Sequence, residues 1–287
     1  MNIYLCKDKP LKINIKYPIK EIIVMRKIYL LVTIALIFAS CSSVLLTGRK
    51  QLLLVSDAEV LAMSATSYKQ FIDSVPASKD TLNARMVRRV GVKIAAAVEQ
   101  YLKNNGLGAD TANYNWEYNL VKDTVQNAFC MPGGKIVVYE GILPITKDET
   151  GLAVVLGHEI AHAVAKHSNE RLSQQMVASF GSELTNMLLN NKSATTKQTI
   201  NILYGIGAQV GVMLPYSRKH ELEADRLGLI FMAMAGYNPT EAIGFWERMA
   251  ANSQGASLEV LSTHPSDANR IAQIKAILPE AMKFYKQ

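Results

Sequence analysis

The sequence has few cysteines, and they cannot build a disulfide framework. Three occur in 287 residues, at positions 6, 41 and 130. We expect Cys6 to be removed with an N-terminal leader and Cys41 to carry a lipid, which leaves Cys130 alone. A hydrophobic core must therefore hold the fold together, and the 49% of hydrophobic residues is ample for one.

Strong charge of either sign is missing after the first forty residues. The formal net charge is +7, from 31 Lys and Arg against 24 Asp and Glu. Residues 1–40 hold seven of the basic side chains and only two acids, so 24 basic and 22 acidic side chains remain for the rest. A nearly neutral body does not favour nucleic-acid binding, and we expect none.

Long apolar runs are also missing beyond the leader, and no internal repeat is evident. No later stretch of 18 residues is free of charge and strong polarity, so the sequence predicts no transmembrane helix there. The absence of a repeat argues against a solenoid. These features predict a soluble body on a lipid tether.

Residues 25–41 have the pattern of a lipoprotein signal peptide. A short basic head, Met-Arg-Lys, covers 25–27, and an uncharged apolar run covers 28–39. The run ends in Phe-Ala-Ser-Cys, which resembles a bacterial lipobox with Cys41 as the lipidated residue. We therefore expect 1–24 to be a mis-assigned start, 25–40 a signal peptide, 41–55 a lipid-anchored tether and 56–287 the folded domain. The expected location is a bacterial cell envelope, anchored through Cys41, with the periplasmic side of the outer membrane preferred.

After residue 55 the hydrophobic pattern is mostly helical. A capping box at Ser56–Glu59 predicts a helix to about Asp73, and apolar residues recur every four positions from Leu82 to Leu102. Alternating apolar residues predict strands at 114–121 and 135–143, the second after Pro-Gly-Gly. Further helices are expected at 149–166, 172–213, 217–236, after 239 and at 266–278. The fold class is therefore α+β, mostly α, with one small sheet.

The sequence His158-Glu159-Ile160-Ala161-His162 carries the strongest chemical signal. Residues four apart on an α-helix lie about 40 degrees apart around its axis, so both imidazoles can hold one cation. Glu159 lies at the border of that face, where it can reach a metal-bound water. The alternative is two core histidines, but buried imidazoles and a carboxylate in so apolar a helix require partners. A zinc ion, one per chain, supplies them.

A catalytic zinc needs a third protein ligand, and the stretch Glu-Leu-Glu-Ala-Asp at 221–225 offers one. Glu221 and Asp225 are four apart and share a helix face, whereas Glu223 lies about 200 degrees from Glu221. We assign Glu221 as the ligand and Asp225 as the group that holds the other nitrogen of a ligand histidine. His220 is the rival ligand, with solvated surface as its alternative.

Two further polar residues near the motif have simpler interpretations. Glu223 is expected to form a surface ion pair with Arg226 or Lys219. His167, which follows the motif by about one helical turn, is expected to serve as a structural ion-pair or capping residue.

Three separated motifs together resemble one enzyme family. They are the HExxH sequence, the stretch from Ser217-Arg218 to Gly228 with its ExEAD core, and Ser262-Thr263-His264-Pro265 followed by Arg270. The set is similar to the zinc metallopeptidases of the CAAX prenyl protease and Oma type, and most to their bacterial periplasmic lipoprotein members. The resemblance covers about residues 55–280 and implies a zincin-like domain with a small sheet beside the HExxH helix.

The resemblance also implies roles for individual residues. It makes His158, His162 and Glu221 the zinc ligands and Glu159 the base, as the spacing argument does, and it assigns Asp225 to a supporting position. The family has a His-Pro loop whose histidine can cap the zinc in some members, and here that histidine is His264. Arg270 would lie at the same rim as an anchor or oxyanion donor. Its alternative is a cap or ion pair on the last helix.

The expected activity is that of a gluzincin-like zinc metalloendopeptidase. Zinc lowers the pKa of a bound water, and Glu159 accepts its proton and later protonates the leaving amine. The strand from Lys135 to Glu140 would pair with an extended substrate through main-chain bonds, so unfolded or misfolded proteins of the cell envelope are the expected substrates. The substrate-binding residues assigned on this basis are Asn127, Lys135, Ile136, Val137 and Val138.

Two other functions remain open. One is a zinc aminopeptidase, which would need a closed pocket with a carboxylate for the substrate amine. The other is a zinc-bound chaperone or assembly factor with latent protease activity, in which His264 closes the metal site. Residues 172–213 are expected to be ordinary core, with a lid or a partner-binding hairpin as the alternative.

Overall fold

The computed structural model describes residues 41–44, 47–190, 193–198, 200–201, 214–252 and 270–286. The chain divides into two compact units, Met1–Cys41 and Ser42–Gln287, and the second contains nearly all of the described residues. The predicted leader and His264 lie outside the described residues. Lipidation of Cys41 stays a prediction. None of the helices in the described part of the chain combines the length and the apolar character that a membrane span requires.

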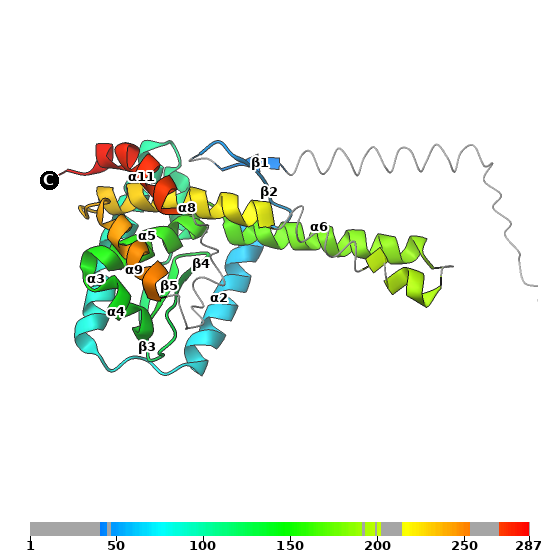
Figure 1. Ribbon diagram of the computed structural model, residues 1–287, viewed down its shortest axis with the longest axis horizontal. Coiled ribbons are helices and arrows are strands. Elements are labelled where there is room, and N and C mark those ends of the chain that lie inside the picture. Colours follow the sequence, from blue (N-terminus) through cyan, green and yellow to red (C-terminus); the bar gives the residue numbers. More distant parts are fainter. Residues whose placement is uncertain are drawn as a thin grey trace, which may run out of the picture. The chain divides into compact units, whose positions relative to one another are not determined.

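The second unit is mostly helical with one small sheet, as the sequence predicts (Figure 1). The strands of the described residues are β1 (Cys41–Ser43), β2 (Lys50–Leu52), β3 (Glu117–Val121), β4 (Ala128–Met131) and β5 (Lys135–Tyr139). Its α-helices are α2 (Asp57–Ser74), α3 (Thr81–Asn104), α4 (Leu143–Thr146), α5 (Glu149–Val164), α6 (His167–Leu188), α8 (Leu214–Met234), α9 (Glu241–Asn252) and α11 (Arg270–Ala281). Short 3₁₀ helices cover Gly108–Asn113, Glu140–Ile142 and Met282–Phe284.

The three-stranded sheet has the order β3-β5-β4, with β5 parallel to β3 and antiparallel to β4. Strand β4 is missing from the sequence prediction, although the Gly133-Gly134 turn that follows it is a hairpin signal. Both glycines have positive φ angles, 87° and 81°, which residues with a Cβ atom rarely adopt. After this turn β5 runs back along β4 and also pairs with β3 on its other side, so β5 is the central strand.

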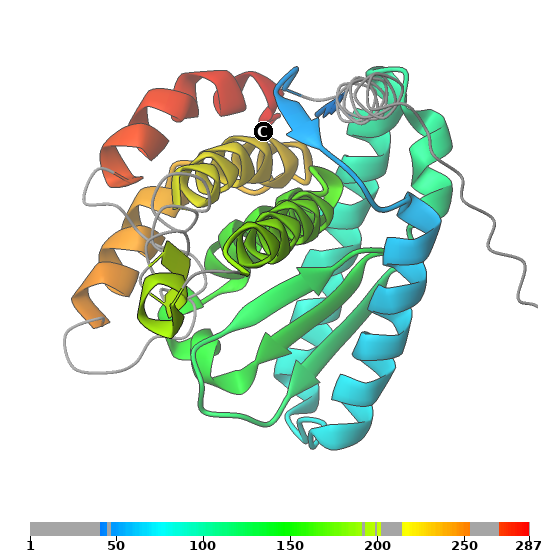
Figure 2. The same ribbon diagram turned by 90° about the vertical axis from the view of Figure 1, so that its right-hand side faces the viewer.

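Alternation of side chains along the strands gives the sheet two apolar faces. On β5, Ile136 and Val138 join the main core with α3 and α5, whereas Val137 and Tyr139 join a smaller cluster. Phe71 of α2 packs in that second cluster against Phe129 and Tyr139. The sheet therefore lies between α2 on one face and α3 with α5 on the other (Figure 2).

Helix α5 passes through the centre of the unit and is buried from Gly151 to Val164. Thr146 ends the short helix α4 and is buried. Asp148 caps α5 and accepts a hydrogen bond from the backbone N–H of Gly151 at 2.9 Å. Full burial explains the near absence of polar residues around this helix.

Part of the segment 41–55, predicted as a lipid-anchored tether, packs against the domain. Residues 50–52 form β2, and Thr47 and Arg49 bond to the buried acid Glu223 of α8. The reason is electrostatic, because a buried carboxylate needs a nearby cation.

The outer part of α6 does not behave as ordinary core. Over about three turns its large apolar side chains are 45–74% exposed. They are Met176, Val177, Phe180, Leu184 and Met187.

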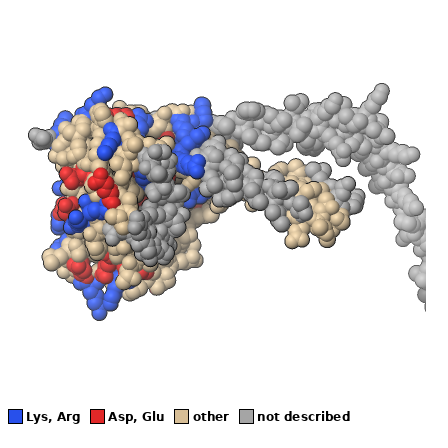
Figure 3. All heavy atoms as spheres, in the orientation of Figure 1, with Lys and Arg blue, Asp and Glu red and all other residues tan. Residues whose placement is uncertain are grey.

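On the face of the molecule seen in Figure 3, basic and acidic side chains are interspersed, in agreement with the small net charge after residue 40.

Candidate metal centre

Two glycines allow the helices that carry the motifs to approach each other closely. A Cβ atom on Gly157 would lie 2.7 Å from the backbone oxygen of Gly228, and one on Gly228 would lie 2.8 Å from the backbone nitrogen of His158. Only residues without side chains fit at such a crossing. Helices α5 and α8 therefore touch through their backbones, which brings Glu221 and Asp225 to the histidines of α5.

The three predicted ligands converge on one point. His158 Nε2 lies 3.0 Å from His162 Nε2 and 3.3 Å from a carboxylate oxygen of Glu221, and His162 Nε2 lies 3.4 Å from the other oxygen. Donors bound tetrahedrally to zinc at about 2.0–2.1 Å lie about 3.3 Å apart. Among the described residues, this is the one group of three or more His, Cys, Asp or Glu side chains with metal-binding spacing.

The donor set also has the chemistry of a zinc site. Two imidazoles and one carboxylate are ligands that zinc prefers, and all three residues are at least nine-tenths buried. Burial alone would lower the pKa of His158, but its bonds to Asp225 and Glu221 raise that pKa to about 9. A metal ion must therefore displace a proton from His158 when it binds. The residues present fit the zinc that the sequence predicts.

Asp225 holds His158 from behind. Its Oδ1 atom lies 2.9 Å from His158 Nδ1, on the opposite side of the ring from Glu221. Burial alone would raise the pKa of Asp225, but Arg270 and His158 lower it, so the group is a carboxylate. This is the supporting position that the sequence assigns to Asp225.

Arg270 is not placed as a free donor at the rim of the site. Its side chain is buried and donates from Nε and Nη2 to Asp225, at 2.9 and 2.7 Å. Its guanidinium also lies 3.5 Å from the ring centre of Trp246. This bidentate pair directs two of its donors to Asp225, and Nη1 lies 3.5 Å from a carboxylate oxygen of Glu221. The expected role of Arg270 as an oxyanion donor stays a prediction.

A second buried polar cluster lies beside His162, and it overturns two sequence interpretations. His220 is 1% exposed and pairs with Glu170 of α6 at 2.9 Å, so it is neither a ligand of the metal centre nor solvated surface. Glu223 is also buried and pairs with Arg49 and His167, both at 2.8–2.9 Å, rather than with Arg226 or Lys219.

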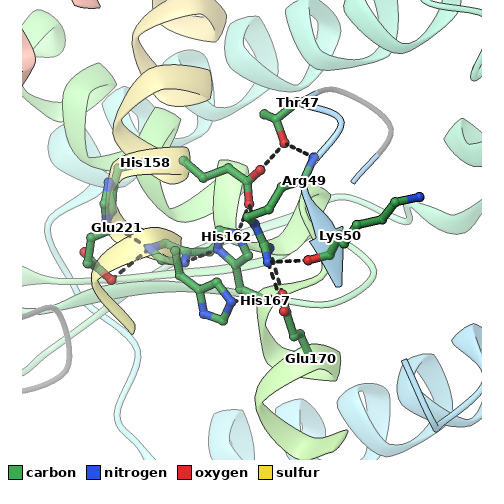
Figure 4. Close-up of polar contacts among 10 residues, drawn as sticks. Thr47, Arg49, Lys50, His158, His162, His167, Glu170 and Glu221 are labelled. Atoms are coloured by element: carbon green, nitrogen blue, oxygen red, sulfur yellow. Dashed lines mark hydrogen bonds and ion pairs between the residues drawn. The ribbon is translucent and has the colours of Figure 1, made fainter. Parts of the chain in front are cut away.

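His162, His167 and Arg49 connect this cluster to the metal ligands. Figure 4 draws His162 between Glu221 and His167, and Arg49 beside Glu170. His167 was expected to have a structural role, and its Nδ1 lies 2.7 Å from His162 Nδ1. The distant partner Arg49 gave no signal in the sequence, because its contacts depend on how the chain folds back.

The predicted substrate strand is wrong in its position. Strand β5 has a neighbour on each side, so the main chain of Ile136, Val137 and Val138 has no edge to offer a substrate. Lys135 is buried and its Nζ pairs with Glu117 at 2.6 Å. Asn127 precedes the edge strand β4, and its side-chain oxygen accepts from the N–H of Ala128. The error follows from the missing β4.

Comparison with known proteins identifies the family. The model of peptidase family M48 matches residues 89–278. Mitochondrial metalloendopeptidase OMA1 of Schizosaccharomyces pombe is 40% identical over 186 residues, 64% of this chain and 53% of that protein. The human metalloendopeptidase OMA1 is 29% identical over 247 residues, 83% and 46% of the two chains.

A bacterial relative is less similar. The beta-barrel assembly-enhancing protease of Escherichia coli K12 is 24% identical over 232 residues, 77% of this chain and 44% of that protein. The chain spans about half the length of the curated relatives it matches. The predicted location in a bacterial outer membrane is wrong, since the more similar fungal and human relatives are named as mitochondrial.

Proposed function

Because the chain belongs to peptidase family M48, we propose that it is a zinc-dependent endopeptidase that cleaves unfolded or misfolded polypeptides. The observation that carries the proposal is the convergence of His158 Nε2, His162 Nε2 and the Glu221 carboxylate at 3.0–3.4 Å. Cleavage of such polypeptides serves protein quality control, and this is the role proposed for the chain. Zinc in this site supplies Lewis-acid chemistry, since it polarises a carbonyl and acidifies water.

Glu159 is the general base of the proposed reaction. It follows the ligand His158 on α5 and is buried, and α5 packs against the edge strand β4. In the proposed reaction it takes a proton from the attacking water and returns it to the leaving amine.

The edge strand β4 is the proposed binding site for the substrate main chain. The backbone N–H of Tyr139 donates to the carbonyl of Asn127 at 3.1 Å, which makes these two residues a hydrogen-bonded pair. Hydrogen-bonded pairs alternate along an antiparallel ladder, so the main-chain groups of Ala128 and Cys130 point away from β5. The N–H of Ala128 is bound by the Asn127 side chain, which leaves the carbonyl of Ala128 and both main-chain groups of Cys130 for a substrate. An extended segment can bond there without a particular sequence.

An apolar groove at one end of β4 supports unfolded polypeptides as substrates. It has a volume of about 240 Å³ and lies between α2 and α6. Its walls include Val60 and Met63 of α2, Met131 at the end of β4, Pro132 after that strand, and Leu172 of α6. Side chains exposed by unfolding are largely apolar, and such a groove can accept them.

The proposal is tested by metal analysis together with a casein digest. The purified wild-type protein should hold one zinc per chain and cleave casein at internal bonds, and a chelator should abolish cleavage. Glu159→Gln should keep the zinc and lose the cleavage. Glu149→Gln is the matched control, because Glu149 begins the same helix but pairs with Arg89 instead.

Each other result has a definite meaning. Full turnover by Glu159→Gln would refute the assignment of the base. Release of single N-terminal residues would replace the endopeptidase with an aminopeptidase. Zinc binding by the wild type without any cleavage of casein would favour the zinc-bound assembly factor.

A further inference from the structure

His162 differs from most metal-ligand histidines in the partner of its second ring nitrogen, which is usually a carboxylate, a backbone carbonyl or a water. Its Nε2 atom faces His158 and Glu221, and its Nδ1 atom lies 2.7 Å from Nδ1 of a second histidine, His167. His167 in turn places Nε2 2.9 Å from the carboxylate of Glu223. A line of three side chains thus leads from the metal-facing nitrogen to a buried carboxylate.

The hydrogen atoms along this line can be arranged in one consistent way. A metal ligand must present a lone pair at His162 Nε2, so the ring hydrogen of neutral His162 lies on Nδ1 and is donated to His167. His167 accepts at Nδ1, carries its own hydrogen on Nε2 and donates it to Glu223.

Glu223 is held by two partners from the N-terminal segment as well as by His167. The hydroxyl of Thr47 donates to one of its carboxylate oxygens. Arg49 donates from Nε to Glu223 at 2.8 Å and from Nη1 and Nη2 to Glu170 at 2.9 and 2.7 Å. One guanidinium therefore joins α8 to α6 next to the ligand.

The orientation of the His167 ring is restricted from its face as well. His220 stacks on it with ring centres 4.2 Å apart and planes inclined by 14°. His220 Nε2 lies 2.9 Å from Glu170, which Arg49 also holds. Rotation of His167 would therefore disturb both the stack and its bond to Glu223.

The other ligand histidine is held in a parallel manner. Nδ1 of His158 is 2.9 Å from Asp225, and Arg270 of α11 binds that carboxylate with two bonds. His158 contacts a carboxylate that an arginine binds. His162 reaches such a carboxylate–arginine pair through one further residue, His167. Groups behind ligand histidines fix ring orientation and raise metal affinity.

We propose that His167, Glu223 and Arg49 act as positioning residues for the ligand His162, so that residues before β2 form part of the metal centre. The proposal rests on the proposed function, because it takes His162 to be a zinc ligand. It extends the centre to a segment that no metal-binding motif includes.

The test measures the metal itself in variants of the full chain. Zinc affinity is obtained by competition with a chelator, and the visible spectrum of the Co²⁺-loaded protein reports the ligand geometry. His167→Phe fills the volume but removes both bonds, so zinc should bind about 10–100-fold more weakly and the Co²⁺ spectrum should shift. His167→Asn keeps an acceptor near the position of Nδ1 and should restore most of the affinity.

Arg49→Gln provides a second route that leaves His167 unchanged. It removes the cation between Glu223 and Glu170, and zinc affinity should fall in the same direction as for His167→Phe. The matched control is Arg226→Gln. Arg226 lies on α8, as Glu223 does, and its pair with Glu280 is broken by this substitution. The control should leave zinc affinity and the Co²⁺ spectrum unchanged.

The results separate this proposal from the metal site on which it rests. If the wild type does not bind zinc, or if Glu221→Ala binds it equally well, the proposed metal centre fails. If Glu221→Ala loses zinc but His167→Phe and Arg49→Gln keep wild-type affinity and spectrum, only the positioning role is overturned. Lower urea stability of these two variants with unchanged zinc affinity would overturn that role as well. If His167→Phe does not fold, the zinc affinity and the Co²⁺ spectrum of Arg49→Gln test the positioning role.

Discussion

Asp225 Oδ1 lies 2.9 Å from Nδ1 of His158, and this bond connects the second motif of the chain to the first. The two residues are 67 positions apart and belong to helices α8 and α5. Arg270 neutralises the carboxylate from the third motif. The motifs therefore meet at one ligand histidine, and this contact can be tested.

Asp225→Asn should weaken zinc binding about 10–100-fold. An amide accepts a weaker hydrogen bond from His158 than a carboxylate does, and the charge of Arg270 is left buried without its partner. Zinc affinity by chelator competition provides the measurement. Glu280→Gln is the control, because Glu280 binds Arg226 away from the ligands. Equal affinity of Asp225→Asn and wild type would mean that Asp225 does not hold His158.

Gly228→Ala should lower both stability and zinc affinity. The added Cβ would lie 2.8 Å from backbone atoms of α5, including the nitrogen of His158, so the helices must separate. Overpacking of this kind costs about 1–3 kcal/mol. Urea unfolding and chelator competition measure the two effects.

Gly244→Ala is the matched control for that change. A Cβ there would meet only the end of the Arg248 side chain, at 3.3 Å, and alanine is about 1 kcal/mol better than glycine in a helix. Its stability should be equal or higher. Equal stability of Gly228→Ala and wild type would contradict the close crossing of α5 and α8.

Glu170→Gln should destabilise the protein by about 3 kcal/mol near neutral pH, because it removes a buried acid from Arg49 and His220. Burial alone would raise the pKa of Glu170, but bonds from His220 and Arg49 lower it below the usual 4.5. The stabilisation is therefore complete above pH 4.5 and is lost as the pH falls through the folded-state pKa.

The measurement for Glu170 is the unfolding free energy of both proteins between about pH 3 and 7, a range chosen around that pKa. The difference between wild type and Glu170→Gln should shrink as the pH falls. Glu183→Gln, an acid farther along the same helix, should differ little from wild type throughout. A difference that stays constant down to the lowest pH would show that the charge of Glu170 is not what stabilises the fold.

Cys130 should resist alkylation in the folded protein. Burial raises the pKa of its thiol, and only the thiolate reacts readily. Iodoacetamide at mildly alkaline pH, followed by peptide mapping, should leave Cys130 unmodified. The same treatment in urea should label it fully. Rapid labelling without denaturant would mean that β4 opens readily or is not packed as described.

Local patterns in the sequence determined much of this protein. The four-residue spacings in α5 and α8, the capping box at Ser56 and the apolar period from Leu82 to Leu102 all depend on neighbours within one helix. Helical geometry also placed Glu221 and Asp225 on one face. For this reason the mostly helical fold and the grouping of the three ligands could be predicted.

Other features depend on contacts between distant segments. Whether β5 was an edge or a central strand depended on β4, whose four residues are too few for a clear period. Glu223 looked like a surface acid because its partners, Arg49 and His167, lie 174 and 56 positions away. Only the tertiary structure decided these points, since burial and ion pairing are set by which segments pack together and not by the spacing along one of them.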